Sequence, residues 1–272
     1  MSRFNRQLTL GLTFLILTSV ALALLHRRYG AGWPAYAYVT GWGLFAIILF
    51  LSVYNGRKKL PFLPLGSSET WLQLHIYLGL LTAIVFLFHI RFHLPTGWFE
   101  GTLAWLYVLV MVSGILGLAV TRVFPRRLTA RGGEVIYEKI PGLRDNLRQQ
   151  AETIVLGGEN PSKTLAEFYA RRLSFFFAEF RNFGHHLVES RRPLNSLVAE
   201  LEDLRRYLGE TERGGLEKIL MLVRQKDTLD YHQALQRALK LWLFVHVPLT
   251  WSLLIFSFVH IALVYAFAGG GK

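Results

Sequence analysis

Five long stretches of this chain carry almost no charge, and they restrict its possible folds more than any other feature. A helix needs roughly 20 apolar residues to cross about 30 Å of hydrocarbon, and soluble domains seldom contain such stretches. The whole chain is 52% hydrophobic and 18% charged, which is also unusual for a soluble domain. The sequence therefore predicts an all-α membrane protein, a bundle of five membrane-spanning helices. The predicted spans are residues 8–25, 37–54, 71–92, 102–121 and 241–268.

The first stretch has a competing interpretation as a secretory signal, because Arg3 and Arg6 precede it and it ends in Ala21-Leu22-Ala23. The apolar core of a signal is usually about 7 to 15 residues long. This stretch has 18 residues, so we interpret it as a membrane anchor.

The chain has a formal net charge of +12, and the positions of its basic residues explain the excess. Cytoplasmic loops of membrane proteins are rich in Lys and Arg near the ends of the spans. This rule puts the N-terminus in the cytoplasm and, after five spans, the C-terminus outside a cell inner membrane. Membrane lipid is then the expected partner, and nucleic acid is not. The basic residues on the predicted cytoplasmic side are Arg3, Arg6, Arg57, Lys58, Lys59, Arg122, Arg126 and Arg127, and those opposite are mainly Arg27, Arg28 and Arg91.

A polar insertion separates the fourth predicted span from the fifth. The expected division is 1–121 for the first four spans, 122–240 for a cytoplasmic helical insertion, and 241–272 for the fifth span and a short external tail. Apolar spacing predicts helices over 164–182 and 194–208, and a helix from Asp230 into the fifth span. Residues 134–140 are either a short strand or an irregular edge. The insertion lacks the glycine motifs of nicotinamide and flavin dinucleotide folds, so we expect it to be a docking or regulatory element.

The chain contains no cysteine, which excludes iron–sulfur ligation by thiolates, covalent attachment of c-type haem, and disulfides. Any redox group must therefore be held by other atoms. Histidine is the side chain that remains for this purpose.

Four histidines lie within the predicted spans, where ionisable residues are rare and usually functional. His75 and His89 are on the third span, His246 and His260 are on the fifth, and each pair is 14 residues apart. Fourteen helical steps return a side chain to within roughly 40° of its first direction and advance it by about 21 Å. The two spans run in the same direction, so His75 lies at the depth of His246 and His89 at the depth of His260. This predicts two sites, each with two opposed imidazoles that suit the axial positions of a haem iron.

The residues between the histidines allow two interpretations. Small residues leave room for a flat macrocycle, but they also permit close packing of helices. A zinc site is a poor alternative, because zinc ligands converge on one centre rather than forming layers about 21 Å apart. The residues on these faces are His75, Gly79, Thr82, Phe86 and His89 on the third span, and His246, Thr250, Leu253, Ser257 and His260 on the fifth.

Each of the two helices carries a pair of histidines with 13 other residues between them. This pattern resembles the di-haem arrangement of respiratory cytochrome b subunits and of ferric-reductase or NADPH-oxidase membrane domains. The resemblance covers roughly 71–121 and 241–268, and it implies two b haems held by His75, His89, His246 and His260. The Pro-Glu-Trp-Tyr segment of quinol-oxidising cytochrome b is absent from the sequence, and so is the dinucleotide-binding domain of the oxidases. The resemblance therefore implies an electron conduit whose donor and acceptor belong to other molecules.

The expected function is that of a di-haem b-type cytochrome subunit of an oxidoreductase complex. It would move electrons across the inner membrane between a quinone pool or cytoplasmic donor and redox protein subunits. One alternative is a self-contained quinone-dependent or metal-ion reductase. Another is a haem-free membrane scaffold or metal transporter, in which the histidines bond to neighbouring residues.

Other polar residues have open or modest roles. His93 and Arg91 either bond the propionates of the outer haem or anchor the chain at the interface, and a third alternative makes His93 a substitute haem ligand. We expect His232 to be a surface residue, with a path for electrons or quinone as the alternative. His26, His185 and His186 are expected to be solvated or bonded to neighbours, and Pro248 is expected to kink the fifth span.

Overall fold

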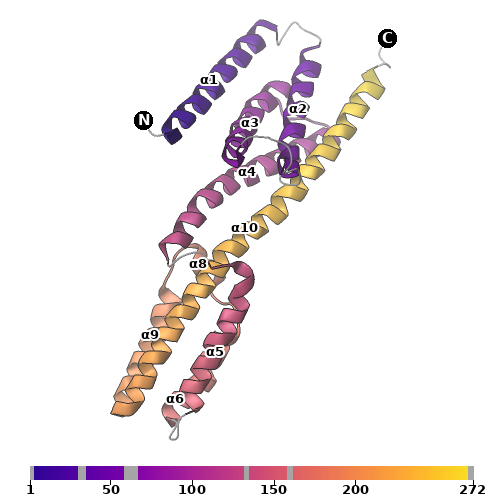
Figure 1. The fold of residues 1–272 in the computed structure, drawn as a ribbon. Coiled ribbons are helices and arrows are strands. Elements are labelled where there is room, and N and C mark those ends of the chain that lie inside the picture. Colours follow the sequence, from indigo (N-terminus) through magenta and orange to yellow (C-terminus); the bar gives the residue numbers. More distant parts are fainter. Residues whose placement is uncertain (1–2, 30–34, 58–66, 132–134, 158–161, 269–272) are drawn as a thin grey trace. The chain divides into compact units, whose positions relative to one another are not determined.

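The computed structural model describes residues 3–29, 35–57, 67–131, 135–157 and 162–268, and every regular element within these ranges is a helix. This confirms the all-α fold class. The side chains of residues 3–10, Leu12, 55–57 and Thr211 lie outside the description. The chain forms two compact units, of which unit 1 is Met1–Leu118 with Trp242–Lys272 and unit 2 is Ala119–Leu241 (Figure 1).

Unit 1 contains the apolar helices. They are α1 (Arg3–Tyr29), α2 (Tyr36–Arg57), α3 (Ser68–His89), most of α4 (Trp98–Ala130) and the last part of α10 (Glu210–Ala268). Among the described residues, four of these helices, α2, α3, α4 and α10, are long and apolar enough to cross a membrane. The predicted first span, 8–25, lies within α1, and the count of five spans stays a prediction.

The ends of two spans differ from the predicted ones for local reasons. The hydroxyl of Ser67 accepts a hydrogen bond from the backbone N–H of Thr70 at 3.2 Å and so caps the start of α3. This helix ends at His89 rather than at 92, and Arg91 and Phe92 follow with φ of 51° and 60°. Helix α4 continues beyond 121 to Ala130 and contains Pro125 in its interior.

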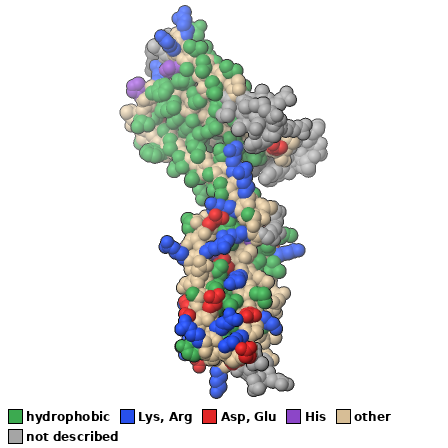
Figure 2. All heavy atoms as spheres, turned by 90° about the vertical axis from the view of Figure 1, so that its left-hand side faces the viewer, with side chains coloured by type: hydrophobic (Ala, Val, Ile, Leu, Met, Phe, Trp, Pro, Cys, Tyr) green, Lys and Arg blue, Asp and Glu red, His purple; other side chains and the backbone are tan. Residues whose placement is uncertain are grey.

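The core of unit 1 lies where α2, α3, α4 and α10 meet. Its fully buried apolar side chains are Leu44, Ile48, Leu81, Val85, Tyr107 and Leu253. Most other apolar side chains of these helices point outward, and Figure 2 shows them gathered over unit 1, whereas acidic and basic side chains mix on unit 2. An apolar exterior is expected where lipid is the neighbour.

Unit 2 is a helical domain with a core of its own. Helices α5 (Ile140–Leu156), α6 (Lys163–Phe168), α7 (Ser174–Ala178), α9 (Arg192–Leu204) and the first part of α10 contribute the buried apolar side chains. The shorter elements are η1 (Tyr137–Lys139), η2 (Tyr169–Leu173), α8 (Phe183–Leu187) and η3 (Arg205–Tyr207). Apolar residues at helical spacing on α10, such as Leu216, Ile219 and Val223, face this core.

Several predictions for the insertion need correction. The strand alternative for 134–140 is wrong, because Tyr137–Lys139 is a 3-10 turn and Ile140 begins α5. Pro141 stands in the first turn of α5, where a helix has no use for the missing N–H. The helix predicted over 164–182 is divided into α6, the π-helical η2 and α7, and the last helix begins at Glu210 instead of Asp230.

Candidate functional site

The structure brings together His75 on α3 and His246 on α10. The two imidazoles interact electrostatically, and both side chains are half-buried. The ring of Tyr54 from α2 lies against His75, with 5.1 Å between ring centroids. Nδ1 of His75 is buried and has no hydrogen-bond partner among the described residues.

Helix α4 holds His246 through small residues. The Oγ of Ser113 lies 2.7 Å from Nδ1 of His246. Trp242 stacks on the His246 ring, with centroids 5.5 Å apart and an angle of 23° between the planes, and donates from Nε1 to the Ser113 carbonyl at 2.8 Å. A side chain at Gly114 would place its Cβ 3.8 Å from Cε1 of His246, and a Cβ at Gly117 would collide with Trp242. These glycines allow α4 to approach α10 closely.

The second pair is His89, the last residue of α3, and His260 on α10, and these two rings also interact electrostatically. Thr40 of α2 places its Oγ1 3.3 Å from Nδ1 of His89. A Cβ at Gly41 would lie only 2.9 Å from Cε1 of His89, so glycine is needed here for the ring to approach α2. Phe99 of α4 stacks against His260 at 6.5 Å between ring centroids.

His89 and His260 line the same cavity. The cavity has a volume of about 210 Å³ and an open mouth. Cofactor pockets usually occupy about 300 to 1,000 Å³, so this cavity is smaller than a typical one. The other polar groups that line it belong to Tyr38, Trp42, Tyr107, Ser257 and Tyr265, and the remaining lining is apolar. Trp42 donates to the Tyr265 hydroxyl at 2.9 Å, which ties α2 to α10 beside the cavity.

The face of α3 between His75 and His89 packs partly against Tyr107 of α4. Thr82 is buried and accepts a hydrogen bond from the Tyr107 hydroxyl at 3.0 Å. The ring of Phe86 stacks on Tyr107 with 4.1 Å between centroids. A Cβ at Gly79 would meet no atom within 4 Å, so open space adjoins α3 there. The glycine on this face is therefore not required by a close helix contact.

The donor types of both pairs fit a haem. Each pair offers imidazole nitrogens from two separate helices, and the second pair also lines a largely apolar cavity. In the described part of the chain, no three His, Cys, Asp or Glu side chains are grouped to hold a metal ion. A haem needs only two protein ligands, because the porphyrin supplies the other four.

The remaining histidines near the predicted outer face have local partners. Nδ1 of His26 bonds the Tyr36 hydroxyl at 2.7 Å, which confirms the expected local bonding. His93 is exposed, with Nδ1 2.6 Å from the Arg91 carbonyl, and the Arg91 guanidinium lies 6.0 Å from the centre of the Tyr36 ring. For these two residues, bonding to haem propionates and anchoring at the interface both stay open, and so does the role of His93 as a substitute ligand. The side chain of Arg57, and Lys58 and Lys59, lie outside the described residues.

Unit 2 contains a buried group of ionisable side chains that sequence reasoning missed. Lys226 is 0% exposed and Asp230 is 1% exposed. The Lys226 ammonium donates to Asp230 at 2.5 Å and to the Glu179 carbonyl at 2.7 Å. Burial raises the pKa of Asp230 to about 6, although Lys226 acts in the opposite direction. The spacing of four residues on one helix was the available signal, and it is shared by many exposed ion pairs.

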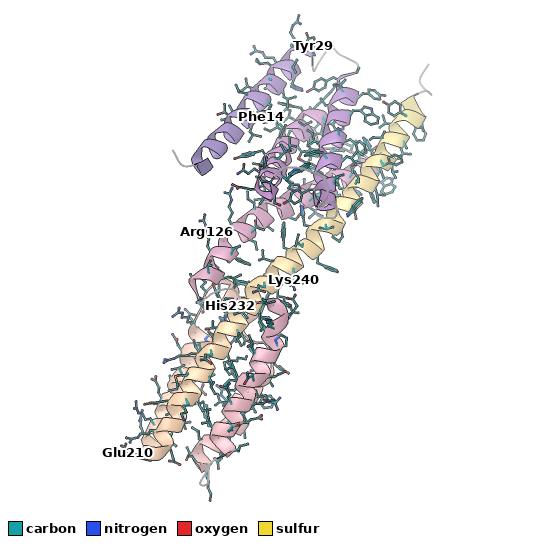
Figure 3. All side chains as sticks on the ribbon, in the orientation of Figure 1. Phe14, Tyr29, Arg126, Glu210, His232 and Lys240 are labelled. Atoms are coloured by element: carbon teal, nitrogen blue, oxygen red, sulfur yellow. The ribbon has the colours of Figure 1, made fainter. Side chains whose placement is uncertain are left out.

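Two histidines of unit 2, His186 and His232, are also buried. The prediction for His232 needs correction. His232 lies on the part of α10 in unit 2 (Figure 3). It is 1% exposed, so the expectation of a surface residue is wrong. Its Nε2 lies 3.5 Å from the Arg131 carbonyl, and burial lowers its pKa. Nε2 of His186 lies 3.9 Å from a carboxylate oxygen of Asp227. Burial, followed by the charges of Arg131 and Lys226, lowers the pKa of His186 to about 4.

Comparisons with protein-family models, with curated proteins and with solved structures found no match to this chain.

Proposed function

We propose that this chain is a di-haem b-type cytochrome subunit that moves electrons across the inner membrane. The observation that supports this most is the pairing of four membrane histidines, His75 with His246 and His89 with His260. Pairs in two layers are what an electron conduit requires, whereas histidines that only stabilise helix packing have no need for this arrangement.

Each pair would hold one haem through imidazole nitrogens on opposite sides of the ring. Haem b bound in this way would supply a one-electron redox centre. On each helix, the two ligands are 14 residues apart and so about 21 Å apart along the axis. That separation places one site toward each face of a bilayer about 30 Å thick.

The surroundings of the histidines suit this role. The chain holds the rings with hydroxyls, aromatic faces and small residues rather than with acidic groups. Gly41 lets the ring of His89 lie close to α2. The cavity at His89 and His260 is mainly apolar, which would favour contact with a macrocycle over contact with water.

The topology and partners belong to the same proposal. It has five spans, a cytoplasmic N-terminus, an external C-terminus and unit 2 in the cytoplasm as a docking or regulatory element. A lipid quinone is the proposed small partner, because a redox site near either face is accessible from the membrane. Soluble redox subunits would complete the complex.

The test is a count of haem in the purified chain. Acid–acetone extraction and pyridine haemochrome analysis should give two non-covalent b haems per chain, and His93→Ala should leave that number unchanged. One haem per chain, or haem that stays attached, would contradict the two-layer arrangement. Purified protein without a reducible b-type absorption band would favour the haem-free scaffold or metal transporter.

A further inference from the structure

We propose that Ser113 and Thr40 are positioning residues that fix the tautomers of His246 and His89 and so leave Nε2 of each ring to bind iron. This inference rests on the proposed function. Its basis is the position of the two hydroxyls, each of which lies within hydrogen-bond distance of Nδ1 of its histidine, so that Nε2 is the ring nitrogen left for the iron.

The hydroxyl of Ser113 has two acceptors within reach. It lies 2.8 Å from the Val110 carbonyl on its own helix and 2.7 Å from Nδ1 of His246, and its one hydrogen can serve only one of them. A neutral ring that binds iron through Nε2 keeps its hydrogen on Nδ1, so Ser113 would then donate to Val110 and accept from Nδ1.

Thr40 is placed in a similar way on another helix. Its Oγ1 lies 2.9 Å from the Tyr36 carbonyl, 3.2 Å from the Ala37 carbonyl and 3.3 Å from Nδ1 of His89. The His89 ring also makes a hydrogen bond to the backbone of Ala37. With iron at Nε2, Nδ1 of His89 would keep its hydrogen, and Thr40 would donate to a carbonyl and accept from Nδ1.

The surroundings of each ring limit its rotation. Trp242 covers one face of His246 and is itself tied to the Ser113 carbonyl. The backbone of α2 at Gly41 abuts Cε1 of His89. A hydroxyl that accepts from Nδ1–H also increases the electron donation of Nε2, as the hydrogen-bond partners of metal-bound histidines generally do.

In each layer, one of the two proposed ligands contacts a hydroxyl at Nδ1. That ligand lies on α10 in the first layer and on α3 in the second. In the first layer it is His246 on α10, and its counterpart His75 has a buried Nδ1 without a partner among the described residues. In the second layer it is His89 on α3. The two positioning residues should therefore act on different haems, which provides a sharp test.

The experiment is a redox titration of the purified chain, with low-temperature electron paramagnetic resonance of the oxidised haems. In Ser113→Ala, the component that His246→Ala removes should shift to a more positive potential, and the other should stay unchanged. In Thr40→Val, only the component that His89→Ala removes should shift. The matched control is Ser52→Ala, since Ser52 donates to the Ile48 carbonyl at 2.8 Å and bonds no histidine within the described part of the chain.

Further variants protect the test against misfolding. Ser113→Thr keeps a hydroxyl and should retain the wild-type potential, whereas Ser113→Cys replaces it by a weaker acceptor and should give a smaller shift in the same direction. Two haems with unchanged potentials in Ser113→Ala and Thr40→Val would overturn the inference and leave the proposed function intact. A wild-type chain without haem would instead refute the proposed function itself.

Discussion

The buried pair of Lys226 and Asp230 allows a quantitative prediction for unit 2. The two side chains are 0% and 1% exposed, and the ammonium also bonds the carbonyl of Glu179 at 2.7 Å. Lys226→Met keeps the length and apolar character of the stem but removes the charge. The carboxylate of Asp230 would then be left with the backbone N–H of Arg181, at 3.3 Å, as its recorded hydrogen-bond donor.

The expected loss of stability is large. Breaking a buried ion pair by removal of one partner typically costs about 3–5 kcal/mol. Even with Lys226 present, the pKa of Asp230 is raised from 3.8 to about 6. A shift of that size corresponds to about 3 kcal/mol at pH 7, at about 1.4 kcal/mol per unit, so the pair itself is not strongly stabilising. We therefore expect Lys226→Met to lose about 3–5 kcal/mol, and K226M/D230L to recover most of that loss.

The pH dependence gives an independent check of the cause. A carboxyl with a raised pKa in the folded state loses stability as the pH rises through that pKa, and regains it when protonated. The loss in Lys226→Met should therefore be smaller at pH 5 than at pH 7. Pulse proteolysis of the whole chain in detergent, across a urea series, measures the unfolding of unit 2. An equal loss at both pH values, or a double variant no better than the single one, would refute this reasoning.

Three further predictions concern the ligands, the acid response and the topology. His75→Ala and His246→Ala should each remove the same haem component in a redox titration, and His89→Ala and His260→Ala the other; loss of one component by both His75→Ala and His260→Ala would disprove the pairing. Because the pKa of His186 is lowered to about 4 in the folded protein, stability is lost as the pH falls from 6.5, by up to about 3 kcal/mol, and His186→Gln should flatten the pulse-proteolysis profile between pH 6.5 and 4. Protease added to the cytoplasmic face of oriented vesicles should cut within 122–240, and the purified chain should not oxidise NADH or NADPH; cleavage from outside alone would reverse the topology.

The helical class and four of the long apolar helices could be predicted from sequence because they depend on composition over about 20 residues. Their ends could not, because local geometry decides them. The apolar pattern continues beyond His89, but the positive φ of Arg91 and Phe92 ends α3 earlier. Pro125 suggests a stop, whereas α4 runs through it.

The insertion was harder to predict because its helices depend on contacts within unit 2. The first part of α10 was not predicted from sequence. It contains Gly214 and Gly215, and adjacent glycines usually weaken a helix. In the structure, a Cβ at Gly215 would lie 3.7 Å from a side-chain carbon of Ile154, an ordinary contact distance, so α10 packs beside α5 at this position. His232 was misplaced for a related reason, because its burial comes from the packing of unit 2, which spacing along one helix does not reveal.

The residues of the candidate site could also be predicted only in part from the sequence. The four histidines could be found because their spacing of 14 is a property of single helices. Ser113 and Thr40 could not, because each contacts a histidine from another helix and neither has a sequence pattern of its own. Ser52 makes the same kind of bond to the preceding turn of its own helix. Only the packing of the helices distinguishes it from Ser113 and Thr40. Spacing along one helix can therefore identify candidate ligands, whereas the residues that set their protonation are determined by how the helices pack.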